Sequence, residues 1–377
     1  MATNQRRQVP DSVRLKREAQ KRRKARKKRK AIIFGVEIVV ILVLIVALFF
    51  FLTQSEDGNG AIKGPLVTVL DSEELQIDES VVENEAMKGY KNIALFGVDA
   101  TSSSGLYSSS RSDSMMIASI NMETGDIKLV SLYRDTYLNI GDDSYIKCNH
   151  AYSYGGAAQA IKMMNMNMDM DIESFVTVGY KGLSEVIDGI GGVYIDVDSE
   201  EIKHINNYQI AVAKALGQKD YNPVTETGYQ LLDGVQAASY CRIRYTKGDD
   251  FKRTERQREV IQAIEEQAKK TDVTKLLGIF NDVIDDVYTN ISSDDVIDLI
   301  KNINNYHIVD TNGFPQESMR TTATIGAKGS SVIPTNLVSN VEWLHEYLFG
   351  DTAYEVSTAV RNYSSIIESQ TAEYVQK

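Results

Sequence analysis

The sequence predicts an α/β fold in which a mixed β-sheet lies between two layers of helices. From about residue 91 onward, short apolar runs rich in β-branched residues alternate with longer runs of helical periodicity, and this alternation is typical of α/β domains. Breaks that contain glycine or aspartate separate many of these runs. About 325 of the 377 residues follow an apolar segment that ends at residue 52, which is enough chain for one large domain or two.

The predicted strands are short. Residues 92–100 (NIALFGVDA) have the pattern of a buried strand that ends near Asp99. Two further apolar runs, 112–121 and 126–135, are joined by a turn that contains Gly125, and they predict a hairpin. Additional strands are predicted at the following residues: 175–180, 193–198 and 241–245.

The predicted helices lie between and after these strands. A helix over 181–192 ends at a glycine pair, a common helix terminator. Ser339 is expected to cap a late helix over 333–349. The remaining helices are expected at 155–168, at 227–240, at 251–270 and, two or three in number, within 270–305.

The first 52 residues predict a membrane anchor. Residues 1–30 contain fourteen Lys or Arg against Asp11 and Glu18, and residues 31–52 are apolar apart from Glu37. At roughly 1.5 Å per residue, such a helix crosses a hydrocarbon core of about 30 Å. A cleaved signal peptide is the alternative, but the apolar run is longer than a signal-peptide core and no small-residue cleavage site follows it.

The basic flank is expected to stay in the cytoplasm, because positive charge beside a membrane segment sets its orientation. The chain is then a single-pass membrane protein whose C-terminal part is extracellular. Residues 53–90 are polar and acidic and predict an extracellular stalk, 91–350 hold the predicted domain, and 351–377 form a C-terminal tail. We expect the basic tail to contact the lipid bilayer and the protein to bind no nucleic acid.

One short stretch has a charge opposite to that of its surroundings. Residues 53–377 carry 27 of the 41 Lys and Arg and 49 of the 52 Asp and Glu, a formal charge of −22. Yet seven of the nineteen residues 240–258 (YCRIRYTKGDDFKRTERQR) are Lys or Arg. A cationic cluster on so acidic a surface is better suited to holding one specific anion than to attracting anions in general.

Periodicity places several of these cations on one side. Alternation in the predicted strand 241–245 puts Arg242 and Arg244 on one face. In the helix that follows, the apolar stripe continues back through Gln257 and Arg253. These two residues lie near the helix end at which the dipole favours anions.

The other cations of this helix are expected elsewhere, with Arg256 at the margin of that face and Lys252 and Arg258 pointing outward. A guanidinium suits bidentate phosphate binding, so the inward cluster indicates a phosphate or pyrophosphate ligand. The alternative is that Asp249, Asp250 or other carboxylates simply neutralise these arginines.

Three further segments bring carboxylates and arginines to predicted strand ends. They contain Asp99, the pair Arg111 and Asp113, and the pair Arg134 and Asp135. Ligands of open α/β sheets bind beyond the carboxyl ends of the strands, where these side chains are expected. Two carboxylates together with phosphate oxygens suit Mg²⁺. Each of these short motifs alone would more often be a surface ion pair.

Taken together, the ordered motifs resemble the LytR-CpsA-Psr family of membrane-anchored cell-envelope transferases. They are, in chain order, NIALFGVD, RSDSMM, SLYRDTYLNI, KCNHAYSYGG, DGIGGVYIDV, LLDGVQAASYCRIRY and DDFKRTERQR. The likeness runs from about Asn92 to Gln257, with a looser match at the late IPTN segment, and the predicted anchor also fits. The stretch SSSGLYSSS at 102–110 is a local variation.

The resemblance implies a single α-β-α domain with a hydrophobic pocket for a polyprenyl lipid. It implies transfer of a glycopolymer from undecaprenyl pyrophosphate to peptidoglycan through a phosphodiester bond, as in the attachment of teichoic acid or capsule to a Gram-positive wall. Asp99 and Asp113 would hold Mg²⁺, and Arg134 and Asp135 would be catalytic, with the proton-transfer role of Asp135 left open. The pyrophosphate would be bound by Arg111, Arg134, Lys147, Arg242, Arg244, Arg253 and Gln257.

Two alternatives to the transferase remain: a hydrolase that cleaves the prenyl pyrophosphate, and a regulator that binds the lipid without catalysis. The identity of the polymer, the acceptor hydroxyl and the general base stay undetermined at this point. A disulfide between Cys148 and Cys241 is permitted outside the cell, and two reduced buried thiols are the alternative. The dense methionines at 163–170 are expected to fill the core, with a pliable prenyl pocket as the alternative.

Overall fold

The structure is a computed structural model that describes residues 70, 74–99, 106, 111–244, 249–283, 286–291 and 305–375. The predicted basic tail 1–30, the predicted membrane helix 31–52 and most of the 102–110 loop lie outside these residues. Within the described ranges, no helix combines the length and the apolar character that a membrane span requires.

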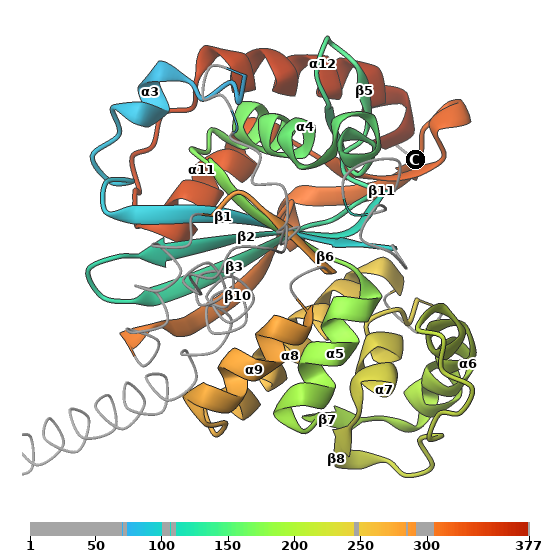
Figure 1. Ribbon diagram of the computed structural model, residues 1–377. Coiled ribbons are helices and arrows are strands. Elements are labelled where there is room, and N and C mark those ends of the chain that lie inside the picture. The colour runs from blue at the N-terminus through green and yellow to red at the C-terminus, as the bar shows by residue number, and fades with distance from the viewer. Residues whose placement is uncertain are drawn as a thin grey trace, which may run out of the picture.

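The central sheet of the described residues has six strands in the order β10-β3-β2-β1-β6-β9 (Figure 1). The strands are β1 Tyr90–Val98, β2 Ser112–Asn121, β3 Asp126–Leu132, β6 Ser174–Val178, β9 Val287–Thr289 and β10 His307–Phe314. β1 pairs with β6 and β3 pairs with β10 in parallel, and the other neighbours pair antiparallel. The predicted mixed sheet is therefore confirmed.

The hairpin of β2 and β3 turns at the predicted glycine. Gly125 has a φ of +74°, a conformation that favours glycine. A Cβ atom at this position would also lie 1.8 Å from the backbone oxygen of Asn305, which belongs to the chain leading into β10. The turn thus accommodates both the reversal of the chain and the close approach of a distant segment.

Helices cover both faces of the sheet (Figure 1). The upper layer contains α3 Glu79–Val82, α4 His150–Met168, α11 Leu337–Phe349 and α12 Thr358–Val375. The lower layer contains α5 Tyr180–Ile190, α6 Ser199–Ala215, α7 Gly234–Tyr240, α8 Asp249–Ala268 and α9 Val273–Val283. Successive residues of β1 alternate between two cores: Ile93 packs into the lower one and Ala94 into the upper one.

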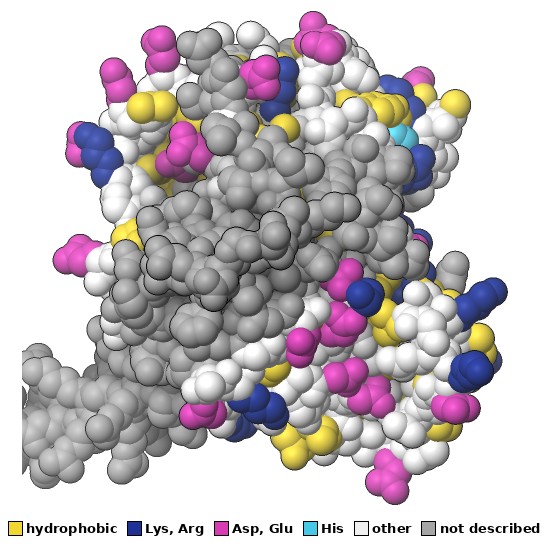
Figure 2. Space-filling view, viewed as in Figure 1, with side chains coloured by type: hydrophobic (Ala, Val, Ile, Leu, Met, Phe, Trp, Pro, Cys, Tyr) yellow, Lys and Arg dark blue, Asp and Glu magenta, His cyan; other side chains and the backbone are white. Residues whose placement is uncertain are grey.

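Three two-stranded ribbons stand beside the central sheet. They pair β4 Tyr137–Asn139 with β5 Tyr145–Lys147, β7 Val193–Val197 with β8 Gly228–Leu232, and β11 Arg320–Thr324 with β12 Ser330–Pro334. Short 3₁₀ helices, Glu317–Met319 and Gly326–Lys328, flank β11. Acidic side chains are spread over both helical layers in the space-filling view (Figure 2), in keeping with the formal net charge of −11.

The helix predicted at 227–240 is confirmed only for α7 Gly234–Tyr240, and the strand predicted at 241–245 is wrong for its described residues. The first half of this segment, predicted as helix, begins with strand β8, which pairs with β7. Asp233 and Gln236 form a capping box that starts α7, and this helix ends with Cys241 as its C-cap. The described residues after it, 242–244, are not a strand. Turns follow, in which the backbone N–H of Arg242 donates to Ser239 and that of Ile243 to Tyr240. These donors are therefore not available to a β-ladder.

Two predictions in the last third also need correction. Residues 270–305 contain helix α9, but they also contain strand β9, which completes one edge of the sheet. The cap of α11 is Asn336 and not Ser339, because the Asn336 side chain accepts a hydrogen bond from the backbone N–H of Ser339.

The fold is longer at both ends than the predicted domain 91–350. Leu75, Val81 and Met87, within the predicted stalk, are buried in the upper core. Residues 351–377 are not a free tail, since they contain α12, whose Val360 and Ile367 are buried in that core. The methionines of α4 and Met170 are buried there too, so their interpretation as core residues is confirmed.

Candidate active site

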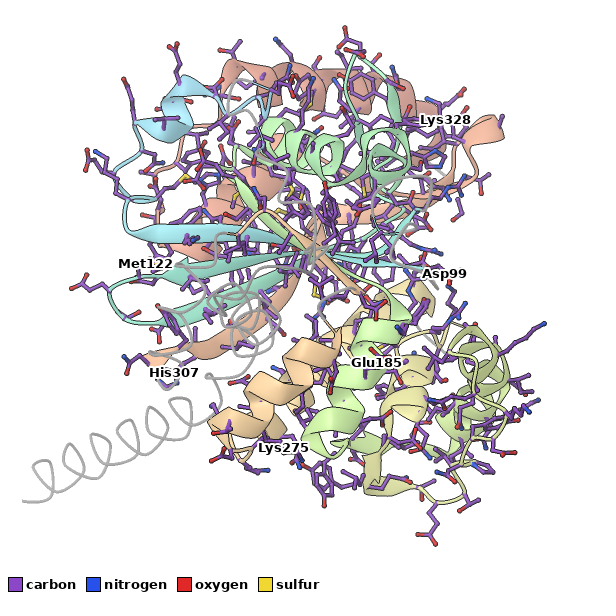
Figure 3. All side chains as sticks on the ribbon, viewed as in Figure 1. Asp99, Met122, Glu185, Lys275, His307 and Lys328 are labelled. Atoms are coloured by element: carbon purple, nitrogen blue, oxygen red, sulfur yellow. The ribbon has the colours of Figure 1, made fainter. Side chains whose placement is uncertain are left out.

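Three strands of the central sheet end together beside the cationic segment. β1, β3 and β6 run in the same direction, and soon after their last residues come Asp99, Arg134 and Tyr180 respectively. β2 runs the opposite way and begins at this end of the sheet. Figure 3 shows Asp99 at this edge, next to the helical layer that contains α5.

Asp113 enters the site through an irregularity in the pairing of β1 with β2. Gly97 pairs with Ser114, whereas Val98 pairs with Ser112, so Asp113 is the extra residue of a β-bulge. Regular alternation would send the side chains of Asp113 and Ser114 to opposite faces of the sheet. With the bulge, both residues line the same cavity.

A cavity of about 230 Å³ at this end of the sheet gathers the charged side chains, and we call it the charged cavity. Its walls are Asp99, Asp113, Tyr180, Tyr208, Cys241, Arg242, Arg244, Arg253 and Gln257. Both predicted metal ligands and four of the seven predicted pyrophosphate ligands are in this set. The structure thus brings together segments that lie up to about 160 residues apart in the chain.

The arginines converge on Asp113. Arg134 donates from Nη1 to its Oδ1 at 2.6 Å, and Arg244 Nη2 lies 3.3 Å from its Oδ2. Arg253 donates from Nη2 to its backbone carbonyl at 2.7 Å. The strand end is therefore held by three guanidinium groups that come from two distant parts of the chain.

Arg242 occupies the other side of the charged cavity. Its guanidinium lies 3.5 Å from Asp99 Oδ2 and sits over the rings of Tyr180 and Tyr208, at 4.6 and 5.6 Å from their centroids. Cation–π contacts of this kind orient a guanidinium without consuming its hydrogen-bond donors. The two tyrosines are site residues that the sequence reading missed; Tyr180 could have been found from its place directly after strand β6.

Asp250 connects Arg134 with Arg253. Its Oδ2 accepts a hydrogen bond from Arg134 Nε at 3.0 Å, and its Oδ1 lies 3.3 Å from Arg253 Nη1. Burial alone would raise the pKa of Asp250, but the positive charges of Arg253 and Arg134 outweigh burial and hold that pKa below its ordinary value. The alternative, in which carboxylates neutralise the arginines, is therefore met in part, by Asp250.

Neutralisation by Asp250 is incomplete at Arg253. This residue is only 2% exposed, and its Nε and Nη1 donate no hydrogen bond to any described residue. Burial, followed by the nearby charge of Arg134, lowers the pKa of Arg253, yet a guanidinium remains charged under ordinary conditions. Nη1 keeps only its ion pair with Asp250, and Nε has no partner among the described residues. A buried donor without an acceptor costs about 1–3 kcal/mol, so the geometry suits an anionic ligand that would accept from these groups.

An apolar cavity of about 140 Å³ adjoins the charged cavity. It lies between β1, β2 and β6 on one side and α5 and α8 on the other, with walls that include Leu95, Met116, Val178, Val260 and Ile264. The two cavities share Asp113, Tyr180, Cys241 and Gln257. A space suited to a hydrocarbon chain therefore opens directly beside a space suited to a polyanion.

A third cavity, of about 340 Å³, is also lined by Arg253, and we call it the polar cavity. Its walls come from the end of β3, the start of α8 and the β11–β12 ribbon, and they include Arg134, Asp135 and Asp250. Among its described walls it shares Arg253 with the charged cavity and no residue with the apolar one.

Three predicted site residues lie away from the charged cavity. Arg111 is exposed, and its charge acts on His150, whose pKa is lowered first by burial and then by Arg111. Lys147, on β5, lies 3.3 Å from Asp135. Asp135 is itself 3.9 Å from Arg134 and faces the polar cavity. Asp135 and Arg134 thus line the polar cavity, and Arg134 also reaches Asp113 in the charged cavity.

The predicted directions of two cations on α8 were wrong. Arg258 does not point outward: it is buried and donates to Ser131 Oγ at 2.9 Å. Arg256 is not marginal either, because its Nε donates to buried Glu201 at 2.6 Å. The causes differ: α6, which carries Glu201, covers Arg256, whereas Arg258 packs against β3, which carries Ser131. Lys252 is exposed, as predicted.

The two cysteines do not form the disulfide that was one of the alternatives. Both are free and buried, and they belong to cores on opposite faces of the sheet, Cys148 to the upper and Cys241 to the lower. Burial raises the pKa of both thiols, that of Cys241 to about 12. A disulfide is excluded by the sheet between them.

The carboxylates of the charged cavity have a donor set that fits Mg²⁺ shared with a phosphate. Asp99 and Asp113 both line the cavity, and the Asp99 side chain is 53% exposed. No group of three or more metal-binding side chains is found among the described residues, so an all-protein cage is not present there. Mg²⁺ commonly binds through one or two carboxylates plus substrate phosphates and waters, which is the arrangement these two residues permit.

Comparisons with known proteins place this chain among relatives with the same fold. It is 32% identical over 208 residues to a polyisoprenyl-teichoic acid–peptidoglycan teichoic acid transferase, TagU, of Enterococcus faecalis; the match covers 54% of this chain and 63% of the relative. The chain therefore spans somewhat less than two thirds of that relative's length.

Solved structures show the same architecture. TagT of Bacillus subtilis superposes with a TM-score of 0.53 at 24% identity, covering 72% of this chain and 94% of the other. A TagT structure with bound octaprenyl pyrophosphate lipid superposes with a TM-score of 0.52 at 22% identity, covering 76% and 99%. At these identities the likeness establishes the fold.

The model of the LytR_cpsA_psr family matches residues 65–337. This range holds more than half of the chain and all three cavities described above. The family resemblance carried by the ordered sequence motifs is thereby confirmed. The chain belongs to the LytR_cpsA_psr family.

Proposed function

We propose that this protein is a phosphotransferase that moves a glycopolymer from a polyprenyl pyrophosphate carrier to peptidoglycan, forming a phosphodiester bond. The single observation that carries the proposal is the wall shared by the apolar cavity and the charged cavity. A polyprenyl pyrophosphate has a hydrocarbon tail and a polyanionic head in direct succession, which matches this pair of spaces. The names of the TagU relatives favour a teichoic acid as the polymer.

The arginines would bind the pyrophosphate and stabilise the charge that develops during transfer. Arg253 offers phosphate oxygens two buried donors that make no hydrogen bond to a described residue, one of them in an ion pair with Asp250, and Arg242 and Arg244 also line the cavity. Phosphoryl transfer depends mainly on positioning and on such fixed positive charge, because the transition state is loose. Gln257 adds a neutral donor where the charged and apolar cavities meet.

A magnesium ion, when held by Asp99 and Asp113, would neutralise further charge on the pyrophosphate. Asp113 is already fixed by Arg134 and Arg244, so its carboxylate is oriented before any ligand arrives. Arg134 also donates a hydrogen bond to Asp250, and this bond fixes the start of α8 relative to the end of β3. The carrier is proposed to be undecaprenyl pyrophosphate, and the domain is proposed to lie outside the cell on a single N-terminal anchor.

The test is a transfer assay with the full chain in detergent. It supplies Mg²⁺, a polyprenyl-pyrophosphoryl saccharide labelled in the sugar, and peptidoglycan fragments. Label recovered on the peptidoglycan supports the transferase. Free sugar phosphate as the main product would indicate a hydrolase instead, and binding of the lipid without cleavage would indicate a lipid-binding regulator.

A further inference from the structure

The polar cavity has the composition of a site for a sugar. Its walls combine the carboxylates of Asp135 and Asp250, the hydroxyl groups of Thr322 and Ser330, and the ring of Phe251. Carboxylates and hydroxyls accept and donate hydrogen bonds with sugar hydroxyls, and an aromatic ring offers an apolar surface to a sugar face. Two guanidinium groups balance the two carboxylates, so the walls present polar groups of both signs beside an apolar surface, and this combination suits a sugar.

The aromatic part of this wall is held rigidly. The rings of Tyr133 and Phe251 meet edge to face, with centroids 4.7 Å apart. The guanidinium of Arg320 lies over both rings, at 4.6 and 4.1 Å, and its Nη1 donates to the Tyr133 hydroxyl and to the backbone carbonyl of Pro315, both at 3.0 Å. Such fixed side chains lose little conformational freedom when a ligand binds.

The three cavities follow one another in a definite order. The charged cavity shares four described residues with the apolar cavity and Arg253 with the polar cavity, while the apolar and polar cavities share none. Arg134 lines the polar cavity and also reaches Asp113 in the charged cavity. The pyrophosphate site thus lies between the apolar space and the polar space.

This order has a consequence for the direction of attack. In phosphoryl transfer the attacking oxygen and the leaving oxygen lie roughly in line on opposite sides of the phosphorus. The leaving group is the lipid phosphate, whose hydrocarbon chain occupies the apolar cavity. The attacking hydroxyl must then approach from the opposite side, where the polar cavity lies.

We propose that the polar cavity is the acceptor subsite and receives a hydroxyl-bearing sugar of a glycan strand; this inference rests on the proposed transferase function. The acceptor oxygen forms a bond to the phosphorus that carries the donor sugar. The bond from that phosphorus to the bridging oxygen breaks, and its electron pair leaves with the lipid phosphate. The hydroxyl proton passes to Asp135, a carboxylate in the wall of the cavity.

Asp135 is the better placed of the two carboxylates for this role. Asp250 is bonded to Arg134 at 3.0 Å and lies 3.3 Å from Arg253, so its charge is already committed to the guanidinium groups. Asp135 lies farther from Arg134, at 3.9 Å, and its other cation is Lys147 at 3.3 Å.

The test compares acceptor-dependent transfer with cleavage of the donor by water. The probes are a labelled polyprenyl-pyrophosphoryl saccharide and uncrosslinked peptidoglycan glycan strands, with the full chain in detergent. Thr322→Val removes one hydroxyl at constant size and should raise the KM for the acceptor about fivefold, the effect of one hydrogen bond of about 1 kcal/mol. Thr322→Trp fills the cavity and should lower transfer more than a hundredfold.

Both variants should leave the KM for the donor within twofold of wild type. Thr322→Val should also leave the rate of donor cleavage by water within twofold, whereas Thr322→Trp should slow that cleavage as well, because an attacking water approaches through the same cavity. Thr322 is exposed, so neither substitution threatens the fold. The matched control is Thr321→Val, which changes the neighbouring residue on the opposite face of β11 and should change no kinetic constant.

Distinct outcomes separate this inference from the proposed function. If the wild-type protein transfers label and Thr322→Trp transfers equally well, the cavity is not the acceptor site, although the transferase function stands. A rise in the KM for the donor alone would assign the cavity to the donor sugar and overturn the inference. If the wild-type protein transfers nothing, the proposed function fails and the acceptor subsite fails with it.

Discussion

Replacing Arg253 with alanine should lower the rate of transfer, whereas replacing another buried arginine of α8 should not. The substitution removes two buried donors, Nε and Nη1, that no described residue accepts. Hydrogen bonds from a charged donor contribute about 1.5–3 kcal/mol each, so the loss at the transition state should be at least ~3 kcal/mol. At about 1.36 kcal/mol per factor of ten, the transfer rate should fall by more than a hundredfold.

The measurement is kcat/KM for transfer from a labelled polyprenyl-pyrophosphoryl saccharide, corrected for the folded fraction of each protein. Donor cleavage by water should fall to the same extent, because Arg253 serves the pyrophosphate whatever the acceptor is. Arg258→Ala is the matched control. It removes a second buried arginine of the same helix, one that bonds Ser131 at 2.9 Å and lines none of the three cavities.

The control should lower stability and leave kcat/KM per folded molecule nearly unchanged. Transfer by Arg253→Ala within threefold of wild type would refute the reasoning, because the unpaired donors would then have no ligand. An equal loss in both variants would also refute it, since the effect would reflect helix packing and not the cavity.

Three further predictions concern the metal, a buried ion pair and acid stability. Asp99→Ala should raise the Mg²⁺ concentration for half-maximal transfer at least tenfold, which a Mg²⁺ titration measures; an unchanged midpoint would remove Asp99 from the metal site. Arg256→Ala leaves Glu201 buried and uncompensated and should lower the free energy of unfolding in urea by about 3–5 kcal/mol, and adding Glu201→Gln should restore part of it. Burial lowers the pKa of His345 to about 4. Between pH ~6.5 and ~4 the imidazole is therefore protonated in the unfolded state and neutral in the folded state. The free energy of unfolding should fall over this range as the pH falls, by at most about 3 kcal/mol. His345→Phe should flatten that part of the urea-unfolding profile, and an unchanged slope would contradict the assignment.

Local sequence patterns predicted the parts of the fold that depend on neighbouring residues. The hairpin at Gly125, strand β6 and the glycine-terminated helix α5 follow from turn chemistry and hydrophobic periodicity within a dozen residues. Where a sequence pattern is compatible with both a helix and a strand, the distant segment that packs against it determines which one forms. Residues 228–232 became a strand because β7 was available for pairing, and the capping box of Asp233 and Gln236 was the local signal that residues 234–240 would be helical.

Some residues of the candidate site could likewise be predicted from local sequence patterns, and others depend on the assembled fold. The inward positions of Arg253 and Gln257 follow from the helical stripe, which depends only on α8 itself. Arg242 and Arg244 line the charged cavity although the described residues 241–244 do not form the predicted strand; they follow the turn after α7 instead. The bulge at Asp113 and the burial of Arg258 depend on register and on covering segments, which are properties of the assembled fold and leave no local signature.

The late position of β10 and of the β11–β12 ribbon affects when a newly made chain becomes competent to bind its ligands. β10 forms an edge of the sheet by pairing with β3, and His307 lies opposite Asp126. Thr322 and Ser330, from the ribbon, complete the wall around residues that were synthesised some two hundred positions earlier. A chain interrupted before residue 305 would leave the edge of β3 open, and an open strand edge is prone to pairing with other chains. A truncated copy would therefore lack part of the wall of the polar cavity and leave the edge of β3 without its partner strand.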